Sequence, residues 1–341
     1  MNKIALAIHG GAGTILKSQM TAKLEAEYRH GLETALKSGW SILELGGSSL
    51  DAVEAAVCSL EDFPLFNAGR GSVFTHEGEQ EMDASIMDGF RLKAGSVAFV
   101  KNIKNPVRLA RLVMERTEHV LLAGEGANHF AEKLEVETAP DEYFFTEHRW
   151  LQLQEAIAAG RVRLDHAVEV EEKGSGGETN SEVLRIPTAE YPKSNIQSRK
   201  SLGTVGAVAC DKNGHLAAAT STGGMTNKKF GRVGDTAIIG AGTYADETCA
   251  ISCTGHGEYF MLASTAHDVA ARMKYKGLNL QDAARETIDH LTQINGEGGL
   301  IAVDALGNVT LPFNSDGMYR ASITSGSVPN TAIYATTESS K

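Results

Sequence analysis

The sequence predicts an α+β fold in which helices are layered on sheets. Segments with strand patterning and segments with helical patterning come in groups along the chain, whereas a doubly wound parallel sheet needs them to alternate. A polar stretch at about residues 162–203 divides the chain into two parts, and each part holds both kinds of segment. The 341 residues, 42% of them hydrophobic, are enough to build a large core.

The first part begins with an apolar run, residues 4–8, that is typical of a buried strand. The HGGAG sequence of residues 9–13 follows it and predicts a tight glycine turn. Leucine and tyrosine then recur every fourth residue, which predicts a helix over residues 21–38. A second helix is expected to start at Ser48, a favourable N-cap residue, and to end before Pro64.

Short segments separated by turn signals come next in the sequence. Residues 72–75, 82–87 and 95–100 have the pattern of adjacent antiparallel strands. The pair Asn105-Pro106 predicts the start of another helix, because proline is favoured at the first helical position.

The second part of the chain repeats this grouping. Apolar runs predict strands at residues 204–210, 216–220 and 250–254. Helical periodicity returns at residues 267–276 and 280–292. A closing hairpin is expected from residues 299–303 and 308–311, around the sequence ALG at 305–307.

The composition indicates a soluble globular protein and argues against several partners. The formal net charge of -11 repels phosphate backbones, so nucleic acid is not an expected partner. The apolar run at the N-terminus is too short for a signal peptide, and no stretch reaches the length of a membrane span. Four cysteines are too few for a disulfide framework, which predicts a reducing, cytoplasmic location.

The bond between Gly203 and Thr204 is the first candidate for chemistry. It separates the polar stretch from an apolar run of small residues, so a cut there would cost the fold little. A threonine freed as a new N-terminus carries both a nucleophile and a base, because its α-amine can take the proton of its own hydroxyl. The alternative interpretation is that Thr204 simply begins a strand.

Clusters of hydroxyl groups, glycines and charges follow Thr204. They are TSTGG at residues 220–224, GRVGD at 231–235 and TGHGE at 254–258. Hydroxyl and glycine N–H groups are the donors that stabilise an anionic tetrahedral intermediate. Arg232 and Asp235 carry the charges needed to hold the α-carboxylate and α-ammonium of an amino acid. The same residues are also typical of turns and surface ion pairs, so their spacing alone leaves both interpretations open.

Other motifs in the sequence are weaker. FNAGRG at residues 66–71 lacks the Lys-Ser/Thr ending of a P-loop, and HGGAG lacks the third glycine of a dinucleotide fingerprint. Both are interpreted as loops. Cys249 and Cys253 have no second pair of ligands to complete a zinc site, so they are expected to pack in the core.

Read together, these motifs resemble those of the plant-type L-asparaginases, also called isoaspartyl peptidases. The resemblance runs from about Lys3 to about Arg320. The sequences that carry it, in order, are HGGAG at 9–13, FNAG at 66–69, MDASIMDG at 82–89, GTVGAVA at 203–209, TSTGG at 220–224, GRVGD at 231–235 and TGHGE at 254–258.

This resemblance implies an N-terminal nucleophile hydrolase (Ntn-hydrolase) with a four-layer αββα sandwich. It implies a precursor that cuts itself between Gly203 and Thr204, by attack of the threonine hydroxyl on the glycine carbonyl. Residues 1–203, with a flexible polar linker at about 162–203, become an α subunit. Residues 204–341 become a β subunit, and both subunits form one structural domain. Two such pairs are expected to associate as a dimer of heterodimers.

The resemblance also implies roles for individual residues. Thr204 matches the nucleophile, with its freed α-amine as the base, and Thr222 matches a second threonine that orients it. The Thr254 hydroxyl and the Gly255 N–H match the oxyanion hole. The remaining matches are Arg232 for the substrate α-carboxylate, Asp235 for the α-ammonium, Gly255 and Gly257 for backbone contacts with the substrate, and Asn67 beside the nucleophile.

The implied reaction releases L-aspartate from β-aspartyl dipeptides and from L-asparagine through a covalent Thr204 ester. No cofactor is implied for catalysis. A structural sodium is implied on the main-chain carbonyls of Leu60, Glu61, Phe63, Phe66, Ala68 and Arg70. The alternatives are a glycosylasparaginase-type amidase, which usually has aspartate where this chain has Gly203, and a non-catalytic protein that binds small amino acids.

Overall fold

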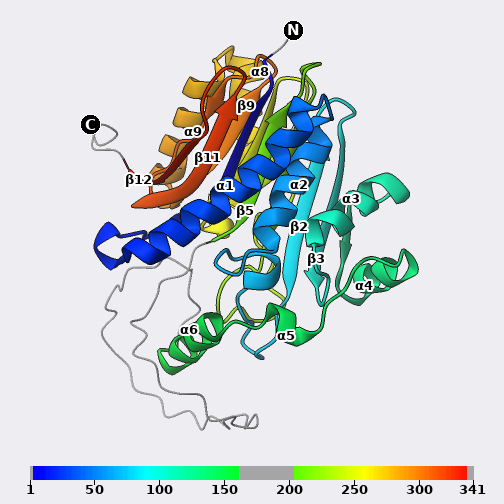
Figure 1. The fold of residues 1–341 in the computed structure, drawn as a ribbon, viewed down its shortest axis with the longest axis vertical. Coiled ribbons are helices and arrows are strands. Elements are labelled where there is room, and N and C mark those ends of the chain that lie inside the picture. The colour runs from blue at the N-terminus through cyan, green and yellow to red at the C-terminus, as the bar shows by residue number, and fades with distance from the viewer. Residues whose placement is uncertain (1–2, 161–202, 336–341) are drawn as a thin grey trace.

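The computed structural model describes residues 3–160 and 203–335, which form two β-sheets covered by helices (Figure 1). The large sheet has the strand order β12-β11-β1-β5-β6-β2-β3-β4, and the small sheet has the order β10-β9-β8-β7. The strands of the large sheet are β1 (Ala5–Gly13), β2 (Met82–Asp88), β3 (Lys93–Val100), β4 (Leu121–Ala123), β5 (Val205–Cys210), β6 (Leu216–Thr222), β11 (Gly317–Thr324) and β12 (Asn330–Tyr334). The strands of the small sheet are β7 (Thr243–Ala245), β8 (Cys249–Gly255), β9 (Gly298–Asp304) and β10 (Val309–Thr310).

Helices cover the outer faces of both sheets. The helices α1 (Ala22–Glu44), α2 (Ser49–Glu61) and α3 (Pro106–Arg116) pack on the large sheet, and α8 (Thr265–Lys276) and α9 (Leu280–Gln293) pack on the small sheet. In Figure 1, α1 and α2 lie in front of the large sheet, and α8 and α9 lie behind it. The other helical segments are α4 (Gly124–Lys133), α5 (Asp141–Phe144), α6 (Glu147–Ala158), α7 (Gly257–Ala263) and the 3₁₀ turns Lys17–Gln19 and Gly69–Gly71.

Alternating side chains show that the sheets pack face to face. In β1, Leu6 and Ile8 belong to the core shared with the helices, whereas Ala5 and Ala7 belong to the core between the sheets. Successive side chains of a strand point to opposite faces, so both faces of this strand are buried. The molecule is therefore a four-layer αββα sandwich, and the predicted fold class is confirmed.

Side-chain caps start the helices that the sequence predicts. The Thr21 hydroxyl accepts the N–H of Leu24, and the Ser48 hydroxyl accepts the N–H of Asp51. Pro106 opens α3, as expected. Each cap satisfies one of the N–H groups that a helix start leaves without a partner.

Several expectations about local structure were wrong. The HGGAG sequence is not a turn, because β1 continues through it with a register shift between His9 and Gly11. Residues 72–75 contribute only an isolated bridge at Thr75 rather than a strand. The hairpin of β9 and β10 does not close the fold, since β11 and β12 follow and extend the large sheet. Pairing between β1 and β11 explains two of these differences, the HGGAG strand and the extension of the large sheet. The two strands are far apart in the sequence, so local patterns do not predict their pairing.

The two parts of the chain share one sheet. β5 and β6 lie between β1 and β2, so strands from after the polar stretch are inserted among strands from before it. The linker expected at about residues 162–203 lies outside the described residues, apart from Gly203. Cys249 and Cys253 are buried free thiols in the core, as predicted.

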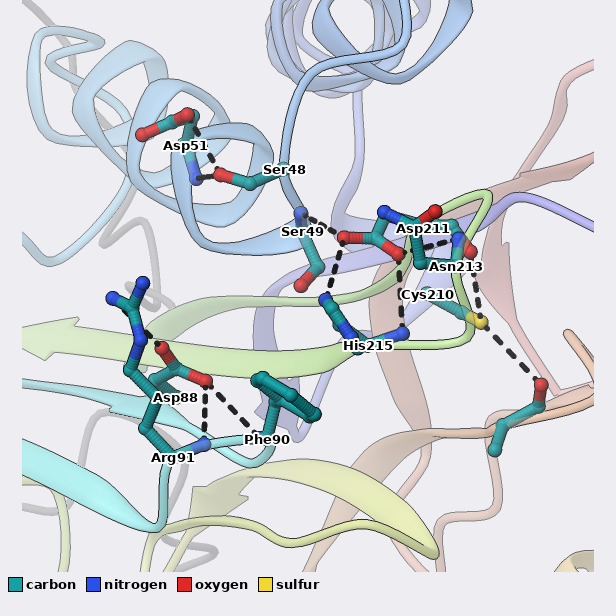
Figure 2. A network of polar contacts seen from close by, with 11 residues as sticks. Ser48, Ser49, Asp51, Asp88, Phe90, Arg91, Cys210, Asp211, Asn213 and His215 are labelled. Carbon is teal, nitrogen blue, oxygen red and sulfur yellow. Dashed lines mark hydrogen bonds and ion pairs between the residues drawn. The ribbon is translucent and has the colours of Figure 1, made fainter.

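A polar network closes the end of β5 that is opposite Thr204 (Figure 2). Asp211 follows the strand, and its carboxylate accepts the N–H groups of Asn213 at 2.8 Å and His215 at 3.1 Å. It also accepts the N–H of Ser49 at 3.4 Å, at the start of α2. The turn between β5 and β6 is thereby attached to the helix layer.

Candidate active site

Thr204 lies at the head of β5, near the middle of the large sheet. Its side chain is 7% exposed, and its hydroxyl donates a hydrogen bond to Oγ1 of Thr222 at 3.2 Å. Thr222 is the last residue of β6, the neighbouring strand, and its Oγ1 also accepts the N–H of Gly224 at 3.0 Å. Antiparallel pairing of these two strands brings the threonines together.

Asn67 supports the turn that follows Thr222. Its side-chain amide donates to the Gly224 carbonyl at 2.8 Å, and its Oδ1 accepts the N–H of Val73 at 3.0 Å. The Asn67 carbonyl accepts the N–H of Gly223 at 3.1 Å. Asn67 is fully buried, so these bonds hold the turn in place and, through it, the Thr222 hydroxyl.

Thr254 and Gly255 end β8 in the small sheet. The fully buried Thr254 accepts the N–H of Ala12 on its Oγ1 at 3.2 Å. Ala12 belongs to the HGGAG sequence of β1, whose His9 lies with Nδ1 3.0 Å from the Thr204 carbonyl. β1 therefore contacts both the expected nucleophile and the expected oxyanion threonine.

Arg232, Asp235 and Gly257 surround one small space. A Cβ atom at Gly257 would lie 2.8 Å from Nη2 of Arg232 and 2.8 Å from Oδ1 of Asp235. Glycine leaves this space open for a ligand that carries both charges. The pairing expected from the sequence, a cation and a carboxylate that together hold an amino acid, is therefore possible in this geometry.

Asp235 is a buried carboxyl group whose Oδ2 has no hydrogen-bond partner among the described residues. Burial raises the pKa of Asp235 to about 7, although the positive charge of Arg232 acts in the opposite direction. A buried carboxylate without a full set of partners is costly, and an arriving ammonium group would supply the missing donor.

Glu258, the last residue of the TGHGE sequence, also belongs to this site, although the motif predicted no role for it. Its carboxylate accepts hydrogen bonds from Nε of Arg232 at 2.8 Å and from Nη2 at 2.9 Å. Burial of Glu258 acts to raise its pKa, but the hydrogen bond and charge of Arg232 outweigh it and lower the pKa. This pairing uses one edge of the guanidinium and leaves the Nη1 edge for a second carboxylate. The sequence signal for this pairing was the positive charge of Arg232 in GRVGD and the negative charge of Glu258 in TGHGE.

The expected sodium ligands run from the last residues of α2, through the segment that follows it, to the turn Gly69–Gly71. Gly69 has φ +50°, and its Cβ position would be 2.5 Å from the Glu61 carbonyl oxygen, so glycine lets this segment fold back over the helix end. The carbonyls of Leu60, Phe63 and Ala68 each accept a backbone N–H at 3.1–3.2 Å. A carbonyl has a second lone pair, and hard cations favour such oxygens, so these three carbonyls keep the capacity to bind a cation. Within residues 3–160 and 203–335, no cluster of His, Cys, Asp and Glu side chains is suited to a metal.

A four-layer αββα sandwich with a buried threonine at the head of a central strand defines the class of Ntn-hydrolases. The family model described as asparaginase matches residues 2–333 of this sequence. The chain therefore belongs to the asparaginase family.

Individual relatives agree with this membership. An isoaspartyl peptidase of Salmonella typhimurium is 49% identical, over 98% of this chain and 99% of its own length. The isoaspartyl peptidase of Escherichia coli is 47% identical, over 98% of this chain and 97% of its own. A plant-type L-asparaginase of Pyrococcus abyssi is 43% identical, over 95% of this chain and 97% of its own length.

None of the helices in the described part of the chain has the length and apolarity to cross a bilayer.

Proposed function

We propose that this protein is a self-cleaving threonine hydrolase that releases L-aspartate from β-aspartyl dipeptides and from L-asparagine. The hydrogen bond between the Thr204 and Thr222 hydroxyls carries the proposal, because it orients a nucleophile at the head of a strand. The names of the relatives, isoaspartyl peptidase and plant-type L-asparaginase, support the choice of substrate.

Self-cleavage begins when Oγ1 of Thr204 attacks the carbonyl carbon of Gly203. The C–N bond breaks as the new C–O ester bond forms, and the threonine nitrogen takes a proton to become a free amine. Water then hydrolyses the ester and leaves a carboxylate on Gly203 and a free hydroxyl on Thr204. The products are an α subunit, residues 1–203, and a β subunit, residues 204–341.

Hydrolysis repeats this chemistry on a substrate. The α-amine of Thr204 takes the hydroxyl proton, and Oγ1 attacks the side-chain carbonyl of the aspartyl unit. Ammonia or an amine leaves with that proton, and water then releases aspartate from the ester. Thr254 already accepts the N–H of Ala12 and still has its own hydroxyl proton, which it donates with the Gly255 N–H to the developing oxyanion.

The aspartyl end of the substrate occupies the space around Gly257. Its α-carboxylate binds the Nη1 edge of Arg232, while Glu258 holds the opposite edge of the guanidinium. Its α-ammonium binds Asp235, whose Oδ2 is otherwise unpartnered among the described residues. Because these groups contact only the aspartyl end, peptides and the simple amide are both substrates.

The remaining parts of the proposal concern cations, assembly and location. The chemistry needs no cofactor, since Thr204 supplies nucleophile and base. A sodium ion held by the carbonyls of residues 60–70 would stabilise the segment that carries Asn67. Two αβ pairs associate as a dimer of heterodimers. The four cysteines are all free thiols, in agreement with a reducing cytoplasm.

Purified protein tests the proposal directly. A denaturing gel should show two fragments, and N-terminal sequencing of the smaller one should begin at Thr204. Thr204→Ala should remain intact and release no aspartate from L-asparagine or from β-aspartyl dipeptides. A wild-type chain that stays intact would contradict self-cleavage, and cleavage of Thr204→Ala would exclude this hydroxyl as the attacking group.

The choice of substrate also separates the alternatives. Preferential hydrolysis of sugar-linked asparagine would indicate a glycosylasparaginase-type amidase. Binding of aspartate without turnover of any of these amides would indicate an amino-acid-binding protein.

A further inference from the structure

We propose that His9 is a positioning residue, which a chain of buried hydroxyl groups holds against Thr204. The inference rests on the proposed function and adds a residue to it. His9 and the hydroxyl-bearing residues of the chain, Ser252, Thr220, Thr243 and Ser85, are all 0% exposed.

The two ring nitrogens of His9 have different partners. Nδ1 lies 3.0 Å from the Thr204 carbonyl oxygen, which can only accept, so Nδ1 carries the proton. Nε2 lies 2.9 Å from the hydroxyl of Ser252 and therefore accepts its proton. The opposite tautomer would place a nitrogen lone pair against the carbonyl of Thr204.

Gly206 provides the space for this contact. It faces His9 across the pair of strands β1 and β5. A Cβ atom at Gly206 would lie 2.0 Å from the Ser252 oxygen and 2.6 Å from Nε2 of His9. Any side chain at position 206 would separate His9 from Ser252. Glycine is therefore needed here, two residues after Thr204.

The chain of hydroxyls continues across both sheets. Thr220 lies 2.7 Å from the Ser252 hydroxyl and also hydrogen-bonds to Thr243. Ser85 lies 2.7 Å from the Thr243 hydroxyl and 2.6 Å from the Thr236 carbonyl oxygen, and its one proton serves one of these two acceptors. The network therefore runs from the carbonyl of Thr204 to Ser85 in β2.

Each hydroxyl has a single proton, and this sets the direction of the network. Because Ser252 donates to His9, the proton between Ser252 and Thr220 must come from Thr220. Burial lowers the pKa of His9 to about 3, while the hydrogen bond to the Thr204 carbonyl opposes this shift, so the ring is neutral. A neutral ring with one fixed tautomer is a rigid support for the backbone of the nucleophile.

A matched pair of variants tests the role of the network. Thr220→Val keeps the shape of the side chain but removes the hydroxyl, and Thr220→Ser keeps the hydroxyl. We expect kcat per free Thr204 N-terminus to fall about tenfold in Thr220→Val, with KM changed less than twofold, because a small misplacement of reacting groups is costly. Thr220→Ser should restore most of kcat. If kcat is equal in the two variants and Thr220→Val only has a lower melting temperature, the network stabilises the fold and does not position Thr204.

Nitrogen-15 NMR of histidine-labelled enzyme tests the tautomer. The His9 signals are those lost in His9→Asn, or those shifted most in Thr220→Val if the first variant does not fold. They should show a neutral Nδ1–H ring that does not titrate between pH 5 and pH 8. An Nε2–H ring, or titration in this range, would overturn the inference.

These tests separate the inference from the proposed function. Wild-type protein that neither cuts itself nor releases aspartate would contradict the proposed function. The NMR experiment would still test the tautomer of His9, because it does not depend on activity. Wild-type protein that does both, with an unaltered kcat in Thr220→Val, would contradict only the positioning role of His9.

Discussion

The Thr204 hydroxyl donates to the Thr222 hydroxyl at 3.2 Å, next to the pair of Val205 and Ser221 at the end of the β5–β6 ladder. Oγ1 of Thr222 also accepts the N–H of Gly224, so two donors converge on it. This acceptor orients the Thr204 oxygen before any substrate is bound, and it is available both for self-cleavage and for hydrolysis.

Replacing Thr222 tests this relationship. In Thr222→Val the acceptor is lost, and we expect self-cleavage and the kcat of processed enzyme to fall by about a hundredfold, a magnitude typical for one lost active-site hydrogen bond. Thr222→Ser retains the oxygen and should keep most of both rates. Fragment formation on gels and aspartate release provide the two measurements. Rapid cleavage and turnover in the valine variant would show that the contact is dispensable.

The space around Gly257 is predicted to admit the aspartyl end of the substrate. Gly257→Ala places a methyl group 2.8 Å from both anchors, so KM should rise at least about tenfold while self-cleavage proceeds, since steric exclusion acts on binding. Gly126→Ala is the matched control, because its Cβ meets no atom within 4 Å and lies in α4. Both variants are assayed for fragment formation, KM and kcat. A normal KM in Gly257→Ala would place the substrate elsewhere.

The ionisation of Asp235 is predicted to set how substrate binding depends on pH. Its pKa of about 7 means that the carboxyl is neutral below pH 7 and cannot pair with an ammonium group, so KM for L-asparagine should rise as pH falls from 8 to 6. Asp235→Asn should raise KM and remove this dependence.

Succinamic acid, which is asparagine without its α-amino group, is the control for this prediction. Its KM should not follow the ionisation of Asp235. The kcat for both substrates should retain a fall at acid pH, because the Thr204 amine has a reference pKa of about 7.7–8.0. Identical pH profiles of KM for the two substrates would contradict the assignment of Asp235.

Asp211 is predicted to contribute to stability rather than to activity. In Asp211→Ala the N–H groups of Ser49, Asn213 and His215 lose their acceptor, which should lower the free energy of unfolding by about 1–3 kcal/mol. Denaturant unfolding measures this change. The kcat and KM of the folded, processed enzyme should stay unaltered, since Figure 2 shows a network at the far end of β5 from Thr204. A large loss of kcat in folded protein would mean that the network is coupled to the site.

The segment of residues 60–70, which contains Asn67, is predicted to bind sodium through backbone carbonyls. Replacing sodium chloride by choline chloride at the same ionic strength should lower the melting temperature of the wild type, because a ligand that binds only the folded state stabilises it. Gly69→Ala strains a residue with φ +50° and crowds the Glu61 carbonyl, so it should lower the melting temperature in sodium and reduce the difference between the salts. Equal melting temperatures of wild type in both salts would argue against the cation.

Much of the local structure follows from the order of residues. The Ser48 cap, the proline that opens α3 and the small apolar run after Thr204 each act on their own segment, so their elements were predicted close to the observed bounds. The motifs also identified the family correctly, because a family resemblance depends on the sequence alone.

Tertiary structure decided the properties that depend on pairing between distant segments. HGGAG has the composition of a turn, but pairing of residues 9 and 11–13 with β11, and of His9 with β5, makes it part of strand β1. The bidentate contact of Glu258 with Arg232 and the hydroxyl chain behind His9 join residues that are far apart in sequence. Local propensity carries no information about such contacts, because the free energy that favours them arises only when the two sheets pack against each other.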